Sequence, residues 1–286
     1  MLTESLNLLK GREISLQEFD TILPFLIPTN REVVIASDFD ETICSNYRYD
    51  EISNTHIPVL SPELIRLTEK IKSPFLIATS RSPKDEEFWP VASTLLGKRN
   101  PPVVCENGAI IFFPNDTSKK TISFLSEDQR KEFNKLQDRV SKIRLKSIFA
   151  ASEVEVLMRN HRMTSIDFRI QHKITKVGIP DLYGELSTFI ESQFDLDSFS
   201  VVSSLNSLSI QLKNINKLVG VKKAIELLGL KRNEIFLIGM GDAPNDKELL
   251  EGADLSIAVR EGASQYAKLF INQGDVAAIM TLNHIK

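Results

Sequence analysis

The sequence predicts an α/β protein, with a parallel Rossmann-like sheet, helices on both of its faces, and a smaller inserted α+β domain. Over residues 31–113 and 211–286, short apolar runs alternate with amphipathic segments, which is typical of parallel sheets covered by helices. Over residues 114–210 the segments are mixed and half-polar, as in an antiparallel sheet. Polar clusters follow the apolar runs of the outer segments, where ligands bind in such folds.

The apolar runs predict the buried strands of the parallel sheet. Each is short and rich in β-branched or other apolar residues, as strands covered on both faces are; they are residues 32–37, 75–78, 102–105, 235–240 and 255–259, with 109–113 continuing in extended form. Helices are expected between them. One has Ser61 as its N-cap and Pro62 at its first position, and a second covers 83–96. A third ends at Gly229, and a fourth begins near Pro244.

The inserted segment, residues 114–210, is expected to form its own small domain. Ser126 and Gln129 form a capping box that begins an amphipathic helix over 126–143. A half-exposed strand over 164–170, a helix around 182–189, and a hairpin from 199–202 and 207–212 complete the prediction.

The first thirty residues predict a local helical extension. Ser15 and Glu18 match a capping box, and Pro24 is expected to stop the helix. We expect this segment to pack on the core and to carry no chemistry.

Composition excludes several classes of protein. The chain has 286 residues, with 35 Lys and Arg against 38 Asp and Glu, a net charge of −3, so nothing favours a nucleic-acid partner. Two cysteines indicate a reducing compartment. No signal peptide is apparent and the longest apolar runs are too short to cross a membrane. We therefore expect a soluble, cytoplasmic protein with no membrane partner; the sequence leaves its oligomeric state open.

Five polar clusters follow predicted elements at one edge of the sheet. Asp38-Phe39-Asp40-Glu41-Thr42 follows the first strand, Thr79-Ser80-Arg81 the second and Glu106-Asn107-Gly108 the third, Lys217 begins a helix, and Gly241-Asp242-Ala243-Pro244-Asn245-Asp246 follows the fourth strand. Asn-Gly and Asp-rich runs also occur in ordinary turns. Five clusters at one edge, however, indicate a site.

The convergence of carboxylates predicts a Mg²⁺ site. Two carboxylates about 4 Å apart repel by about 4 kcal/mol at an effective dielectric of 20, so a group of them needs a cation. Oxygen ligands without His or Cys suit Mg²⁺. A Mg²⁺ site beside a Lys, a Thr hydroxyl and a helix N-terminus is typical of phosphoryl transfer. No Walker-type glycine loop is present.

These motifs resemble the haloacid dehalogenase (HAD) superfamily of aspartate-nucleophile phosphatases, and more narrowly its Cof-like subfamily, over about residues 31–286. Asp38 to Thr42 matches the DxDxT motif, Thr79-Ser80-Arg81 the second motif, Lys217 the third, and Gly241-Asp242 with Asn245-Asp246 the fourth. Glu106-Asn107-Gly108-Ala109 matches a subfamily hallmark. The resemblance implies a HAD core over 31–113 and 211–286 and a specificity cap over 114–210.

The resemblance also implies a role for each matching residue. Asp38 would be the nucleophile that forms an aspartyl-phosphate, and Asp40 the acid/base. Thr79 and Lys217 would hold phosphoryl oxygens. Mg²⁺ would be held by the Asp38 side chain, by Asp242 and by the main-chain carbonyl of Asp40. Asp246 and Asn245 would support that metal site directly or through its ligands. Residues expected to contact the substrate are Thr42, Ser80, Arg81, Asn107 and Asn245.

Two positions depart from the family pattern. Glu41 stands where Gly is frequent, which adds a negative charge near the entrance, and Ser80 replaces a frequent Gly. Neither change removes a catalytic group. In the cap, charged side chains suit contact with an anionic substrate or a solvated surface; they are Arg159, His161, Arg162, Asp167, Arg169 and His172.

The expected function is Mg²⁺-dependent hydrolysis of a small phosphorylated metabolite. The Ala243-Pro244 version of the fourth motif resembles that of sugar-phosphate phosphatases, so sugar phosphates are favoured. Two alternatives stay open: a phosphomutase of the same superfamily, and a non-enzymatic phospho-receiver or binding module. The D-x-D spacing and the inserted domain disfavour the receiver.

Overall fold

The computed structural model describes residues 10–50, 55–97, 101–114, 121–142, 149, 153–159, 162–175, 177–203 and 207–285. The chain forms two compact units, one of Met1–Ile122 with Asn216–Lys286 and one of Ser123–Ile215. Ile143 and His161 lie outside the described residues, as does the start of the N-terminal extension. No described helix is both long and apolar enough to span a membrane.

The first unit is built on a five-stranded parallel sheet, which confirms the predicted fold class. Its strands run in the order β14-β13-β12-β1-β4. They are β1 (Glu32–Ser37), β4 (Phe75–Ile77), β12 (Ile235–Gly241), β13 (Leu255–Ala258) and β14 (Leu269–Phe270). Ser37 lies opposite both Met240 and Ile77, so the carboxyl ends of the three central strands meet at one edge of the sheet.

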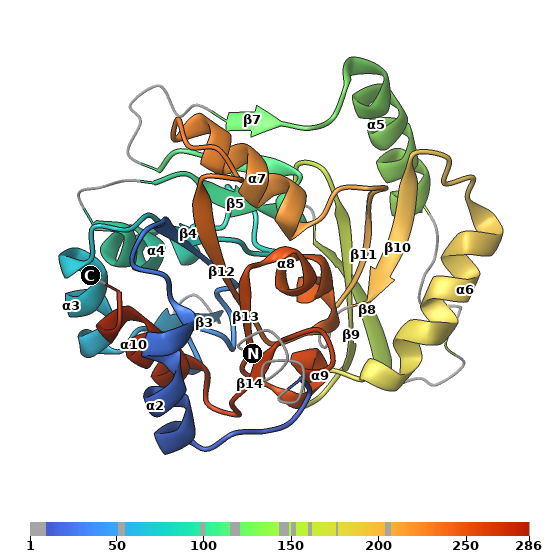
Figure 1. Cartoon of the computed structure of the whole chain (residues 1–286). Helices are drawn as coiled ribbons and strands as arrows, with labels where there is room; N and C mark the ends of the chain where they lie inside the picture. The colour runs from blue at the N-terminus through green and yellow to red at the C-terminus, as the bar shows by residue number, and fades with distance from the viewer. Residues whose placement is uncertain are drawn as a thin grey trace. The chain divides into compact units, whose positions relative to one another are not determined.

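Helices cover both faces of this sheet. In Figure 1, α2, α3 and α10 gather on one side of β12, and α7 and α8 lie on the other. The elements are α2 (Leu16–Leu26), α3 (Pro62–Lys70), α4 (Phe88–Leu96), α7 (Lys217–Leu227), α8 (Lys247–Gly252), α9 (Glu261–Ser264) and α10 (Gly274–Asn283).

Two predicted helix boundaries are wrong. The helix expected over 83–96 begins only at Phe88. Pro24 lies inside α2 rather than ending it. Proline removes one N–H and so one intrahelical bond, but only two further residues of α2 follow it, and the buried Phe19 and Leu23 hold the helix on the core.

The third predicted strand belongs to a separate sheet, which corrects the expectation for 102–105. β5 (Val103–Cys105) pairs antiparallel with β6 (Ile110–Phe112), in a three-stranded sheet with β7 (Thr121–Ser123). The chain reverses at the turn η2 (Glu106–Gly108), where Asn107 has φ 53°, so the residues that follow pair back onto β5. An isolated parallel bridge from Ala78 to Val104 keeps the end of β5 beside that of β4.

A hairpin that the sequence did not reveal follows the first polar cluster. β2 (Asn46–Asp50) pairs antiparallel with β3 (Thr55–Val59). It brings Tyr47 back toward the cluster from which the chain has just emerged.

The second unit contains a four-stranded antiparallel sheet in the order β10-β11-β9-β8. Its strands are β8 (Val154–Arg159), β9 (Ile166–His172), β10 (Phe199–Ser203) and β11 (Leu208–Leu212). Helices α5 (Glu127–Lys142) and α6 (Tyr183–Gln193), the latter preceded by η4 (Pro180–Leu182), pack on one face, around Phe168, Leu186 and Phe133. The capping box of Ser126 and Gln129 is confirmed by both of its hydrogen bonds.

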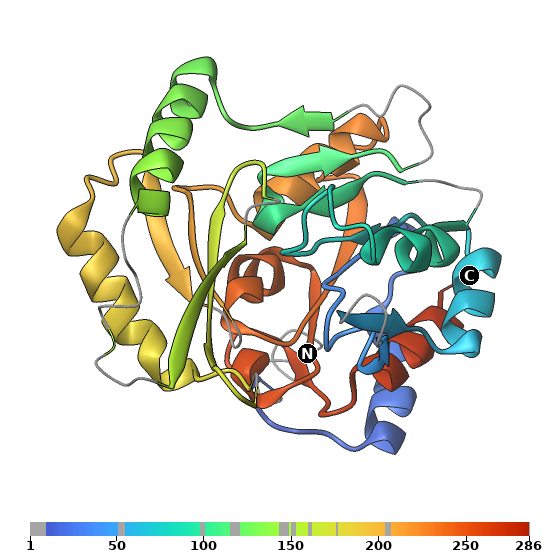
Figure 2. The same ribbon diagram turned by 180° about the vertical axis from the view of Figure 1, so that it is seen from behind.

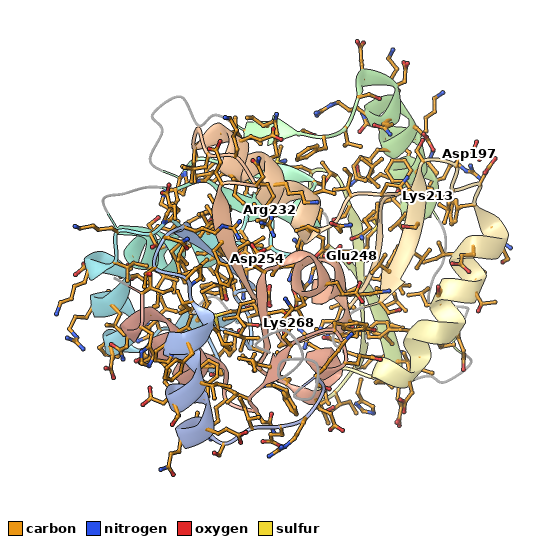
Figure 3. All side chains as sticks on the ribbon, in the orientation of Figure 1. Asp197, Lys213, Arg232, Glu248, Asp254 and Lys268 are labelled. Atoms are coloured by element: carbon orange, nitrogen blue, oxygen red, sulfur yellow. The ribbon has the colours of Figure 1, made fainter. Side chains whose placement is uncertain are left out.

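Charged side chains tie neighbouring turns within each unit (Figure 3). In the first unit, Asp254 Oδ2 accepts bonds from Arg232 Nη1 and from the Leu237 N–H, each 2.8 Å long. These bonds join the turn before β13 to β12, the strand that carries Asp242 at its end. In the second unit, Lys213 Nζ donates to the Asp197 carbonyl over 3.0 Å.

Candidate active site

The predicted site residues of the first unit meet where its strands end. Asp38 directly follows β1, and its N–H donates to the Met240 carbonyl of β12 over 3.0 Å. Thr79 follows β4, and its N–H donates to Val104 over 2.8 Å. Backbone bonds between neighbouring strands thus continue into the turns. The side chains that follow the strands are therefore brought close together.

Lys217 lies at the centre of this group. Its Nζ is 2.6 Å from Asp38 Oδ1 and 2.6 Å from Asp246 Oδ1, and only 1% of its side chain is exposed. Burial alone would lower the pKa of Lys217, but the charges of Asp246 and Asp38 outweigh burial and raise it. Lys217 is therefore a fixed cation against Asp38.

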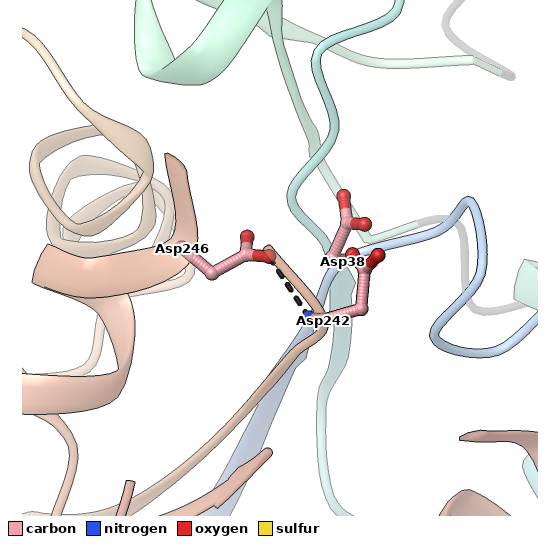
Figure 4. A group of neighbouring side chains, drawn as sticks. All are labelled: Asp38, Asp242 and Asp246. Atoms are coloured by element: carbon pink, nitrogen blue, oxygen red, sulfur yellow. Dashed lines mark hydrogen bonds between the residues drawn. The ribbon is translucent and has the colours of Figure 1, made fainter. Parts of the chain in front are cut away.

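Asp246 supports both Lys217 and the turn that carries Asp242. Its Oδ2 accepts from the N–H groups of Asp242 and Ala243, over 3.0 and 3.1 Å; Figure 4 shows the first of these bonds. A Cβ at Gly241 would lie 2.5 Å from the Asp246 carboxyl carbon, so the glycine permits this close approach. The two oxygens of Asp246 thus contact Lys217 and the turn that carries Asp242.

Asp38, Asp242 and Asp246 form an acidic group whose ligand oxygens lie within 4.8 Å of one another. The Thr42 hydroxyl lies 3.5 Å from Asp38 Oδ2 and 3.4 Å from Asp242 Oδ1. Burial raises the pKa of Asp38 well above its ordinary value, and burial with the Asp246 charge raises that of Asp242 to about 6. Buried carboxylates with raised pKa values, which offer oxygen ligands, suit a hard divalent cation such as Mg²⁺.

Asp40 has a different environment, although it is only two residues from Asp38. Arg81 donates from Nη2 to Asp40 Oδ1 over 2.7 Å and from Nε to Oδ2 over 2.8 Å. The Tyr47 hydroxyl donates to Oδ1 over 2.8 Å. Burial would raise the pKa of Asp40, but Arg81 and Tyr47 outweigh it and lower the pKa. The two aspartates are thus separated electrostatically, and in this state Asp40 is the one held more firmly ionised.

Arg81 has two carboxylate partners. Its Nη1 donates to Asp85 Oδ2 over 3.1 Å, and the guanidinium lies 5.9 Å from the Phe39 ring centroid and 5.7 Å from that of Phe88. Its main-chain N–H donates to the Thr79 hydroxyl oxygen over 3.1 Å. The structure therefore places Arg81 on Asp40 and Asp85, with Ser80 half-buried between Thr79 and Arg81.

The Glu106-Asn107-Gly108 turn is packed against the start of α7. A Cβ on Gly108, whose φ is +100°, would lie 2.0 Å from the Asn216 carbonyl oxygen. Asn216 is the N-cap of α7, and Lys217 is its first residue. Gly108 thus lets the turn support the position of Lys217. In the same region Asn245 Nδ2 donates to Asn107 Oδ1 over 3.3 Å.

Sequence reasoning missed two residues that hold the site together. Tyr47 bonds to Asp40, and Asp85 bonds to Arg81 four residues before it. Gly108 was identified as part of a motif, but not for its close approach to α7. A positive-φ requirement at an Asn-Gly turn was the one signal available for it.

The two cysteines lie buried and form no disulfide; they are Cys44 and Cys105. Burial raises the pKa of Cys44 to about 11. The Cys44 thiol is therefore unsuited to act as a nucleophile near neutral pH.

The described charged candidates of the inserted segment lie on or beside one sheet of the second unit. Arg162 Nη2 and Asp167 Oδ2 form an ion pair of 2.7 Å, with 4% of each side chain exposed. His172 Nε2 lies 3.1 Å from Glu153 Oε2. Arg159 ends β8, and Arg169 lies within β9. The pairing of Arg162 with Asp167 favours a structural role for these two residues.

Comparison with known proteins identifies the family. An α/β core whose aspartates, lysine and threonine meet at the carboxyl edge of the sheet is typical of a class of phosphoryl-transfer enzymes. Within it, the sequence pattern of the haloacid dehalogenase-like hydrolases matches residues 35–270. The chain belongs to this family.

Individual relatives are more distant. A curated protein, phosphoglycolate phosphatase 2 of Saccharolobus solfataricus, is 23% identical over 240 residues, covering 84% of each chain. The C-terminal domain of Candida albicans trehalose-6-phosphate phosphatase has a TM-score of 0.63 at 14% identity, covering 92% of this chain and 95% of its own. A HAD subclass IIB sugar phosphatase has a TM-score of 0.55 at 14% identity, covering 83% and 92%. At these identities the structural likenesses show the fold alone.

Proposed function

We propose that this chain is a Mg²⁺-dependent phosphatase of small phosphomonoesters, with sugar phosphates as the favoured class, and that it works through an aspartyl-phosphate at Asp38. The observation that carries the proposal is the position of Asp38. Its carboxylate lies against the ammonium group of Lys217 and close to Thr42 and Asp242. Such a group combines a nucleophile with positive charge for phosphoryl oxygens.

The reaction would proceed in two displacements. An Asp38 oxygen attacks phosphorus as the ester P–O bond breaks, and Asp40 gives its proton to the departing alkoxide. Water then attacks the phosphorus of the aspartyl-phosphate, Asp40 takes a proton from it, and Asp38 and inorganic phosphate are released. The first displacement requires a proton on Asp40, so its bonds from Arg81 and Tyr47 have to loosen when substrate binds.

Other residues would hold the transferring group. Lys217 and the Thr79 hydroxyl would contact phosphoryl oxygens, with Asp246 keeping Lys217 in place. Mg²⁺ would be held by Asp38, by Asp242 and by the main-chain carbonyl of Asp40, and it supplies charge neutralisation when bound. Substrate contacts are proposed for Thr42, Ser80, Arg81, Asn107 and Asn245.

The substrate class rests on resemblance and on the named relatives. Ala243-Pro244 in the fourth motif resembles sugar-phosphate phosphatases, and two of the similar structures are phosphatases of sugar phosphates by name. The curated relative is named for a small phosphorylated acid. A small phosphorylated metabolite is common to all of them. We further propose that the second unit is the cap that selects among such metabolites.

The test is hydrolysis of p-nitrophenyl phosphate and a panel of sugar phosphates, phosphorylated acids and nucleotides, with and without Mg²⁺. Wild type is compared with Asp38→Asn and with Glu63→Gln, a control on the exposed face of α3, where 52% of the Glu63 side chain is exposed. We expect Asp38→Asn to lower kcat by about 10³-fold or more, and the control to match wild type. Acid-quenched wild type should carry phosphate on Asp38.

Other outcomes would contradict the proposal in distinct ways. Transfer of phosphate to a second sugar position, rather than to water, would indicate the mutase. A phosphorylated Asp38 that persists for minutes without turnover would indicate a receiver. Nucleotides hydrolysed far faster than sugar phosphates would overturn the substrate class.

A further inference from the structure

An ion pair crosses the end of the strand that carries Asp242. Arg260 Nη2 bonds to Glu41 Oε2. Glu41 belongs to the cluster after β1, and Arg260 follows β13, while β12 lies between these two strands in the sheet. The pair therefore bridges the carboxyl end of β12, beside Asp242. Arg260 is close enough that its charge lowers the pKa of Asp242, against the larger raising effects of burial and Asp246.

The backbone at Glu41 is held in a costly conformation. Its φ is 60°, a left-handed value that favours glycine and costs another residue about 1 kcal/mol. The Glu41 N–H donates to the Cys44 carbonyl over 2.8 Å. A Cβ on Gly274 would lie 2.8 Å from the Glu41 carbonyl oxygen, so the chain at Gly274 confines this turn closely. The backbone from which the Glu41 side chain extends is consequently held in place.

Three cations of this edge each have a carboxylate partner. Lys217 has Asp38 and Asp246, Arg81 has Asp40 and Asp85, and Arg260 has Glu41. They differ in exposure. The side chain of Arg260 is 45% exposed, against 16% for Arg81 and 1% for Lys217. Of the three, Arg260 is thus the cation most open to an entering anion, and Glu41 occupies it.

Resting on the phosphatase function proposed above, we propose that Glu41 is a selectivity residue. By occupying Arg260 it disfavours substrates that carry a second anionic group beside the phosphoester. A carboxylate next to the phosphate would have to displace Glu41 from Arg260 or lie beside its negative charge. Phosphomonoesters whose remaining part is uncharged, such as sugar monophosphates, meet no such competition and are favoured.

The proposal is tested by the ratio of kcat/KM for phosphoglycolate to that for glucose 6-phosphate. Glu41→Gln keeps the side-chain shape and removes the charge that pairs with Arg260. The ratio should therefore rise about five- to tenfold, mainly because KM for phosphoglycolate falls. This is the effect expected of one partly exposed charge-assisted hydrogen bond. Arg260→Gln should lower the ratio, because Glu41 is then uncompensated. The double variant should return the ratio towards that of wild type.

A binding measurement complements the kinetics. Phosphonoacetate and methylphosphonate both offer a phosphonate, but only the first adds a carboxylate. With Mg²⁺ present, Glu41→Gln should increase the thermal stabilisation by phosphonoacetate and leave that by methylphosphonate unchanged. Glu234→Gln, which breaks an exposed pair with Lys231 (3.0 Å) before β12, is the matched control and should behave as wild type.

Several results would overturn the inference. The first is a kcat/KM ratio that stays constant in both Glu41→Gln and Arg260→Gln. The second is a ratio that rises equally in Glu41→Gln and in the double variant. The second result would show that Arg260 is not the cation involved. If wild type hydrolyses no phosphomonoester of the panel described above, the proposed function itself fails and the inference falls with it. Wild-type hydrolysis with an unchanged ratio overturns the inference alone.

Discussion

Each of the two units buries an ion cluster, and the clusters differ in charge balance. In the second unit Arg162 faces one carboxylate, Asp167, whose Oδ1 also accepts bonds from the hydroxyls of Ser209 (2.8 Å) and Ser165 (3.3 Å). In the first unit one cation, Lys217, contacts two carboxylates, and Asp242 lies beside them.

This difference separates a structural cluster from a functional one. In the cluster around Arg162, the guanidinium pairs with Asp167, and both oxygens of that carboxylate accept bonds. The cluster around Lys217 has three carboxylates for one ammonium group. Burial, together with the neighbouring negative charges, raises the pKa values of Asp38 and Asp242. Burying uncompensated charge costs several kcal/mol, so an arrangement of this kind is expected where a cation binds.

The largest expected effect follows from removing the single cation of the functional cluster. Lys217→Met should lower kcat about 10²–10³-fold. It should also destabilise the metal-free protein by about 3–5 kcal/mol, because two buried carboxylates lose their partner. Mg²⁺ should restore more stability to this variant than it adds to wild type.

Steady-state kinetics and urea unfolding with and without Mg²⁺ check this prediction. Lys223→Met, also on α7 but with 43% of its side chain exposed, is the control and should change neither quantity appreciably. An unfolding free energy equal in wild type and Lys217→Met would contradict the proposed imbalance.

A smaller effect is expected from the cluster around Arg162. Asp167→Ala removes a buried carboxylate partner of Arg162 and should lower the unfolding free energy by about 3 kcal/mol. The loss should be the same with and without Mg²⁺. The double change Arg162→Met with Asp167→Leu replaces the pair by apolar groups and should cost clearly less than Asp167→Ala.

Hydrogen exchange of the β9 amides reports this locally, since Asp167 lies within that strand. If the double variant is as unstable as Asp167→Ala, packing rather than charge balance holds this region together.

The smallest effect is expected for an ion pair outside both clusters. Lys231 and Glu234 are 3.0 Å apart with 73% and 59% of their side chains exposed. Glu234→Gln should change the unfolding free energy by less than about 0.5 kcal/mol. Chemical denaturation measures this value, and a loss comparable to that of Asp167→Ala would show that burial does not account for the ranking.

Much of the architecture was predictable because its signals are local. The apolar run 32–37 coincides with β1, and the Ser126–Gln129 box begins α5 as expected. The hairpin of β10 and β11 was also anticipated. A short run of apolar residues is buried whatever its neighbours are, and a cap satisfies backbone groups within one turn. The β2–β3 hairpin was missed although Tyr47 and Tyr49 alternate with polar residues, a pattern typical of strands.

The polar clusters after the strands were equally readable, since order along the chain and parallel pairing bring them to one edge. The partners of the charged side chains could not be predicted in this way. Lys217 meets Asp38 across 179 residues, and Arg260 meets Glu41 across 219. Tyr47 reaches Asp40 through no recognisable spacing, whereas Asp85 lies four residues after Arg81. Strand and helix order depends on local periodicity and capping, which the amino-acid order contains directly. Which charges neutralise one another depends on strand order, register and side-chain conformation, and these exist only once the sheet has formed.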